Sequence, residues 1–168
     1  MSGSSKILNK YLQVAGNRIG RKLLLGENGL CVFKSPDLQQ EYVVEFPKHS
    51  DVIYFYAPIC RVPYDCSEEF FEKILELNIC GIEYNQATFG LDAKTQNVVL
   101  SYTRALGSVD DVSFANILCN FVRTADRAKR EVMKLVDALA EKYSLAGDDV
   151  AAEMDKYSAK IKLDKMKA

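Results

Sequence analysis

The sequence predicts an α+β fold: a helix, three strands, a second helix, two strands and a long last helix. We expect a twisted antiparallel sheet packed by the helices, and a homodimer. Apolar residues recur at three- and four-residue spacing in the segments 6–19, 67–80 and 111–144, which is typical of amphipathic helices. Short polar turns separate the strands within the groups 30–59 and 86–103. Strands grouped between helices in this way favour an antiparallel sheet that helices cover on one face.

Length and composition are those of one globular domain. Of the 168 residues, 48% are hydrophobic and 27% are charged. We expect residues 1–145 to form this domain and residues 146–168 to form a charged, partly helical tail. The net charge of −1 argues against non-specific nucleic-acid binding, which needs a basic surface. No apolar run approaches the roughly 20 residues of a membrane span, and the first residues lack the apolar core of a signal peptide, so we expect a cytoplasmic protein.

The first helix precedes three strands, predicted at 30–34, 40–46 and 52–59. The apolar residues of that helix are Ile7, Leu8, Tyr11, Leu12, Ala15 and Ile19. The second strand alternates apolar and mostly polar residues, as a half-buried antiparallel strand does. The third strand, VIYFYAPI, is apolar or aromatic on both faces. It is either a central strand covered on both sides or part of a sheet whose second face is kept for a partner.

The rest of the chain is organised around the stretch 67–91. Its helix begins near Asp65 or Ser67, which can cap it, and its apolar residues cover more than one stripe. One face can lie on the sheet, whereas the other needs a different cover, and we infer that a second copy of the chain supplies it. The helical pattern breaks at Gly81, and two strands, 86–91 and 98–103, form a hairpin around a polar loop.

The last helix is predicted to begin after the polar segment 107–111 and to continue towards Ser144. Its buried stripe has the spacing i, i+4, i+7, i+8 and i+11 and consists of Phe114, Leu118, Phe121, Val122 and Ala125. The charge-dense segment 123–134 is expected to be mostly solvated.

No residue pattern indicates an enzyme, a metal site or a cofactor. The five cysteines form no C-x-x-C pair, and His49, the single histidine, lies in a polar turn. Phosphate-binding loops, nucleophile elbows and zinc-protease motifs are absent from the sequence. The amphipathic first helix, the two-sided second helix and the aromatic third strand together offer more apolar surface than one small sheet needs, which points to protein binding.

The central block then resembles a known family. The run L-E-L-N at 75–78, the break at Gly81, A-T-F-G-L-D at 87–92 and V-V-L-S at 98–101 resemble the class I type III secretion chaperones, the CesT/SycE-like or Tir chaperone family. The resemblance covers about residues 6–143. The chain is somewhat long for the family because of its tail.

This resemblance implies a function. Such chaperones are bacterial cytoplasmic homodimers without enzymatic activity or cofactor. They bind an extended N-terminal segment of a secreted effector and keep it soluble and competent for export. The secretion ATPase is a further candidate partner. Carried onto this sequence, the dimer interface is Phe71, Leu75, Asn78, Ile79, Ile82 and Phe89. The effector-binding residues are Leu8, Leu12, Phe33, Val43, Tyr54 and Tyr56.

A second hypothesis belongs to a different class. A small regulatory or adaptor domain of similar fold would bind a folded protein partner rather than a disordered peptide. Binding to an extended N-terminal peptide separates the two hypotheses, because only the chaperone requires it.

Overall fold

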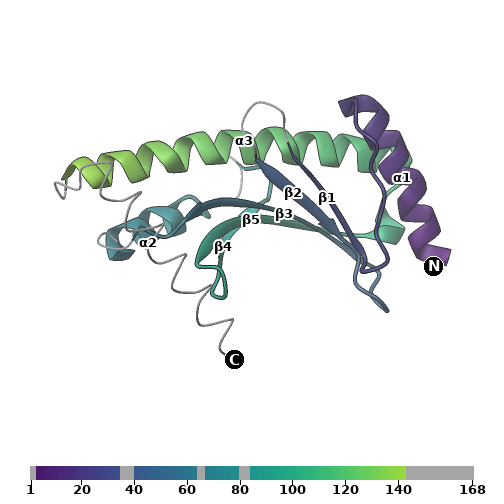
Figure 1. Cartoon of the computed structure of the whole chain (residues 1–168), viewed down its shortest axis with the longest axis horizontal. Helices are drawn as coiled ribbons and strands as arrows, with labels where there is room; N and C mark the ends of the chain where they lie inside the picture. The colour runs from purple at the N-terminus through teal and green to yellow at the C-terminus, as the bar shows by residue number, and fades with distance from the viewer. Residues whose placement is uncertain (1–2, 35–39, 64–66, 80–83, 143–168) are drawn as a thin grey trace, which may run out of the picture.

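The computed structural model describes residues 3–34, 40–63, 67–79 and 84–142. It consists of one antiparallel sheet with helices α1 and α3 on the same face (Figure 1). In chain order the elements are α1 (Gly3–Ile19), β1 (Leu30–Lys34), β2 (Glu41–Glu45), β3 (Val52–Arg61), α2 (Ser67–Glu76), β4 (Thr88–Asp92), β5 (Asn97–Ala105), the single 3-10 turn η1 (Leu106–Ser108) and α3 (Asp111–Lys142). This order confirms the α+β fold that the sequence predicts.

The strands are arranged in the order β1-β2-β3-β5-β4, and every neighbouring pair is antiparallel. The hairpin β4–β5 folds back so that β5 pairs with β3, and α2 connects β3 to the outer strand β4. Strands β1 and β4 are therefore the two edges of the sheet. β3 continues through Pro58 to Arg61, and a register shift between Pro58 and Cys60 accommodates the proline.

The hydrophobic core lies between the sheet and α3. Alternate residues of β2 and β3 are buried beneath the helix, as the two-residue period of a strand requires. Phe55 lies at the centre, with its ring 5.7 Å from that of Phe114 and 5.9 Å from that of Phe121. From α3 the largest buried side chains facing the sheet are Phe114, Leu118 and Phe121. The stripe predicted for the last helix is thus confirmed, with Val122 at its half-buried border.

Helix α3 is one continuous helix of 32 residues. Its start is capped by Asp110, whose carboxylate Oδ1 accepts a hydrogen bond of 2.7 Å from the main-chain N–H of Ser113. The charge-dense segment is helical because the buried stripe continues through it, with Ala125, Ala128 and Val132 all 0% exposed. Its cations, Arg123, Arg127, Arg130 and Lys134, lie on the exposed side. No helix among the described residues is both long and apolar enough to cross a membrane.

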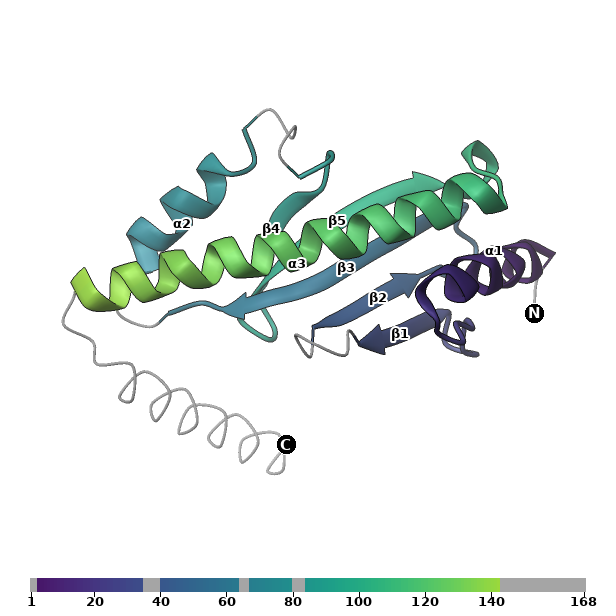
Figure 2. The same cartoon turned by 90° about the horizontal axis from the view of Figure 1, so that it is seen from above.

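Helix α1 lies beside the first half of α3 (Figure 2). The Tyr11 hydroxyl donates a hydrogen bond of 3.2 Å to the Val109 carbonyl, and the Tyr11 ring lies 5.9 Å from that of Phe114. The helix ends at Ile19, and Gly20 follows it with a φ of 67°. The N–H of Arg21 then bonds the carbonyl of Gly16 at 2.8 Å, which is the pattern of a Schellman motif.

Candidate protein-binding surfaces

One face of the sheet is left without a covering helix among the described residues, and we call it the open face (Figure 1). The strand register places Val32, Val43 and Tyr56 in one row across it. Tyr54 lies on the same face, two residues from Tyr56. Val32 is 53% exposed, and the other three are half-buried. Of the two alternatives for the aromatic third strand, the open-face alternative holds for the described residues. Contiguous apolar groups on an uncovered face are typical of a protein-binding surface.

Three of the predicted effector-binding residues do not lie on the open face. Phe33 points to the opposite face, the one that α3 covers, because it pairs with Tyr42 and stacks on its ring at 5.1 Å. Leu8 and Leu12 are 0% exposed, since they lie on the side of α1 that joins the core. The expectation that these three offer surface to an effector is therefore corrected: Leu8 and Leu12 are core residues, and Phe33 packs at its edge.

The second candidate surface is the corner where α2 meets the edge strand β4, which we call the α2–β4 corner. Phe70 and Ile74 face inwards, with exposures of 0% and 4%, whereas Leu75 is 64% exposed. Just beyond the helix, Ile79 is 70% exposed, and on β4 Leu91 is 47% exposed. The helix thus has a buried apolar side and an exposed one. The two-sided pattern of the sequence describes it correctly.

Other residues predicted for the dimer interface act inside the protomer. The Asn78 side chain donates to the Phe89 carbonyl at 3.1 Å and accepts from the Phe89 N–H at 2.8 Å, so it fastens the end of α2 to β4. Phe89 is only 6% exposed and meets the Tyr84 ring edge-on at 5.0 Å. Phe71 is half-buried and packs against the core. Ile82 lies outside the described residues, as do Gly81 and the predicted tail.

Sequence reasoning missed Val32 and Leu91 as members of these surfaces. Val32 follows a buried cysteine in β1, and strand alternation alone assigns it to the face of Val43 once the pairing is known. Leu91 shares a face with Phe89 but lies beyond the cover that buries Phe89. The signal for Leu91 was the two-residue spacing from Phe89, but that spacing does not reveal where a covering helix ends.

The described residues offer little reactive chemistry. Burial raises the pKa of the Cys60 thiol to about 12, and it also raises the pKa of Cys31, so both thiols are protonated at neutral pH and poor nucleophiles. His49 is exposed in a turn, with a φ of 64°. No group of three or more histidine, cysteine, aspartate or glutamate side chains in the described part of the chain could hold a metal ion. Fold and surfaces together are those of a small α+β domain with two candidate protein-binding surfaces.

The chain belongs to the Tir chaperone protein (CesT) family, whose model matches residues 10–129. This match confirms the resemblance seen in the central block. No curated protein matches the chain at a significant level.

Solved structures have the same fold. The ExsC–ExsE complex contains a chain with 22% identity and a TM-score of 0.62, and the match covers 77% of this chain and 96% of that one. A chain of the HopA1–SchA chaperone–effector complex has 8% identity and a TM-score of 0.61, with coverages of 77% and 98%. A chain of the ExoU–SpcU complex, from the type III secretion system of Pseudomonas aeruginosa, has 15% identity and a TM-score of 0.56, with coverages of 76% and 96%.

Proposed function

We propose that this protein is a type III secretion chaperone that acts in the bacterial cytoplasm. It binds the N-terminal region of a secreted effector in extended form and keeps it soluble and competent for export. Membership of the Tir chaperone family over residues 10–129 carries the proposal. It is supported by a chain of similar fold in the HopA1–SchA chaperone–effector complex.

The open face supplies a physical basis for binding an unfolded segment. An extended peptide presents every second side chain on one face. The open face offers apolar groups for these side chains, because Val32, Val43 and Tyr56 lie beside one another on neighbouring strands. Either edge strand, β1 or β4, can add main-chain hydrogen bonds to such a peptide. A segment held in this way cannot refold on itself. These contacts require no nucleotide, metal or covalent chemistry, and we propose that the protein has no enzymatic activity.

The α2–β4 corner is the proposed contact with a second copy of the chain. Leu75, Ile79 and Leu91 are exposed there in one protomer, and pairing with a second copy would remove them from water. Burying a large aliphatic side chain contributes roughly 1.5–3 kcal/mol. Because this corner is distinct from the open face, a dimer formed through it leaves two open faces for the effector.

Native mass spectrometry of the protein isolated from its own host tests this function. We expect a dimer carrying one copy of a secreted protein, and the mass identifies that protein. Isolated peptides from its N-terminal region should then bind the purified chaperone. A complex with a folded cytosolic partner that has no affinity for such peptides would instead support the adaptor hypothesis.

A further inference from the structure

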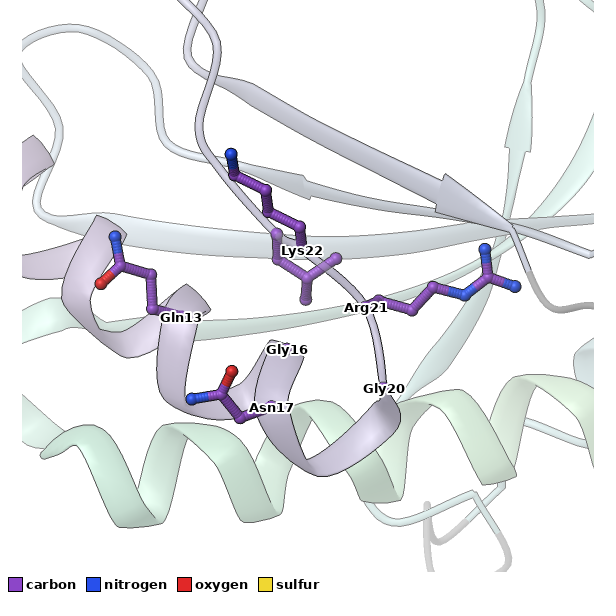
Figure 3. A pocket seen from close by; sticks show the side chains of 7 residues that line it. Gln13, Gly16, Asn17, Gly20, Arg21 and Lys22 are labelled. Atoms are coloured by element: carbon purple, nitrogen blue, oxygen red, sulfur yellow. The ribbon is translucent and has the colours of Figure 1, made fainter.

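A polar hollow of about 310 Å³ lies at the carboxyl end of α1, away from both surfaces described above (Figure 3). It forms because the chain reverses at Gly20 and returns along the helix. The residues that line it are Gln13, Gly16, Asn17, Gly20, Arg21, Lys22 and Leu23. None of these lining residues carries a carboxylate.

The backbone beneath the hollow is closely packed. The Schellman bond from the Arg21 N–H to the Gly16 carbonyl, at 2.8 Å, holds the returning segment against the helix. A Cβ on Gly16 would lie 2.3 Å from the Arg21 carbonyl oxygen, so only glycine allows this approach. Leu23 forms an apolar floor and is 2% exposed. The backbone of the hollow is therefore in place before a ligand binds, whereas the exposed Gln13, Asn17 and Lys22 side chains would be ordered by it.

Exposed polar side chains surround the hollow, so each can meet a ligand from solvent. Gln13 and Asn17 are four residues apart and so project from the same side of α1. Figure 3 shows their amides near the cavity and the Lys22 side chain rising on the same side as Gln13, whereas Arg21 points away from both amides. Among the described residues, none of these side chains has a hydrogen-bond or ion-pair partner.

Helix electrostatics explain only part of this arrangement. Cations near the carboxyl end of a helix are stabilised by the helix dipole. Arg18 fits that explanation and is also engaged, because it donates a hydrogen bond of 2.5 Å to the Asn116 side chain on α3. The negative end of the dipole disfavours an anion here, so the Lys22 ammonium and the two amides have to outweigh it for a carboxylate to bind. Those groups together offer several donors and a positive charge, which is the chemistry that binds a carboxylate.

We propose that this hollow binds an aspartate or glutamate side chain in an extended acidic segment of the protein partner. Lys22 supplies the charge, and the Gln13 and Asn17 amides supply hydrogen-bond donors. The inference rests on the proposed function, since it assigns a second, polar subsite to the binding of a partner. Nucleic acid is a poorer occupant, because the chain has a net charge of −1 and phosphate recognition needs a more extensive basic surface.

The test is an NMR titration of the full chain with a disordered peptide of Gly-Ser-Glu-Glu repeats. We expect saturable shifts of the Gly16, Gly20 and Lys22 backbone amides, and no such shifts with Gly-Ser-Gln-Gln repeats. The affinity should fall as NaCl is raised from about 0.05 M to about 0.5 M, because salt screens exposed charges. Lys22→Gln should weaken binding by roughly fivefold, the upper range for an exposed ion pair. The double variant Gln13→Ala/Asn17→Ala should weaken it further.

Arg123→Gln is the matched control, since it removes one exposed cation from α3 and leaves the hollow intact. It should keep nearly the wild-type affinity. Equal losses in Lys22→Gln and Arg123→Gln, or equal binding of inorganic phosphate and the acidic peptide, would overturn the proposal in favour of general electrostatic attraction. The absence of saturable shifts would also overturn it. Neither result bears on effector capture by the open face, which native mass spectrometry tests separately.

Discussion

Gly16 illustrates how one residue without a side chain shapes the end of α1. The returning backbone occupies the place that a Cβ would take, 2.3 Å from the Arg21 carbonyl oxygen. We predict that Gly16→Ala destabilises the protein by about 1–3 kcal/mol, the usual cost of overpacking, although alanine favours helices elsewhere. Urea unfolding measures the change. Gly3→Ala, in the same helix with no atom within 4 Å of its Cβ position, is the control and should be neutral or slightly stabilising.

The Asp110 cap makes the stability of the start of α3 depend on pH. Hydrogen bonds from Ser113, first from its side chain and then from its main-chain N–H, lower the pKa of the Asp110 carboxyl below its ordinary value of 3.8. A lowered pKa in the folded state means that the ionised carboxylate stabilises the fold. That contribution is complete above the unfolded-state pKa and disappears as the pH falls through the lower folded-state pKa.

We therefore predict that Asp110→Ala lowers the melting temperature at neutral pH. The difference from wild type should stay constant down to about pH 5 and shrink below the ordinary carboxyl pKa. Thermal melts followed by circular dichroism across this range measure it. Asp137→Ala, which removes an exposed carboxylate from the interior of the same helix, should not reproduce this effect. A difference that grew in acid would contradict the cap.

Among the elements, α2 combines one buried apolar face with one exposed apolar face. Phe70 and Ile74 hold it to its own protomer, and Leu75 faces outwards. We predict that Leu75→Asp/Ile79→Asp weakens the dimer at least tenfold, because charges would have to be buried in the interface, while the protomer stays folded. Analytical ultracentrifugation gives the dimer constant, and circular dichroism reports folding.

Val112→Asp is the control for the α2 variant. Val112 is 51% exposed on α3, so its substitution adds the same charge to an exposed apolar site outside the α2–β4 corner. The control should remain as dimeric as wild type. A wild-type protein that is monomeric at micromolar concentration would refute the dimer proposal altogether.

At the scale of the whole molecule, binding should depend on which face of the sheet a residue occupies. We predict that Val32→Asp on the open face lowers the affinity for the effector's N-terminal segment by about tenfold, since a charge would replace an apolar contact. Calorimetry with the segment identified in the native complex measures this change. Leu24→Asp is closely matched, because Leu24 and Val32 are both 53% exposed and Leu24 lies outside the sheet. Equal losses in the two variants would argue against the open face.

The order of the elements, their approximate bounds and the family could all be predicted from local sequence patterns. Periodicity is a local property: the spacing of Phe114, Leu118 and Phe121 specifies a helix with one buried stripe wherever the helix lies. The many apolar residues of the second helix and the third strand likewise predicted that some of them would be exposed in a single protomer. The central block carried the resemblance to the chaperone family, which the match over residues 10–129 confirms.

Which apolar residues are core and which are surface became clear from the packed structure and not from the sequence pattern. A strand pattern states that Phe33 and Val32 lie on opposite faces, but which face a helix covers depends on where α3 packs after the chain has folded. For the same reason Leu8 and Leu12 proved to be core, although their spacing equals that of an exposed binding stripe. The hollow beside α1 forms because the returning chain packs closely against a glycine of that helix. Local periodicity cannot predict such contacts, because burial depends on how the whole molecule packs.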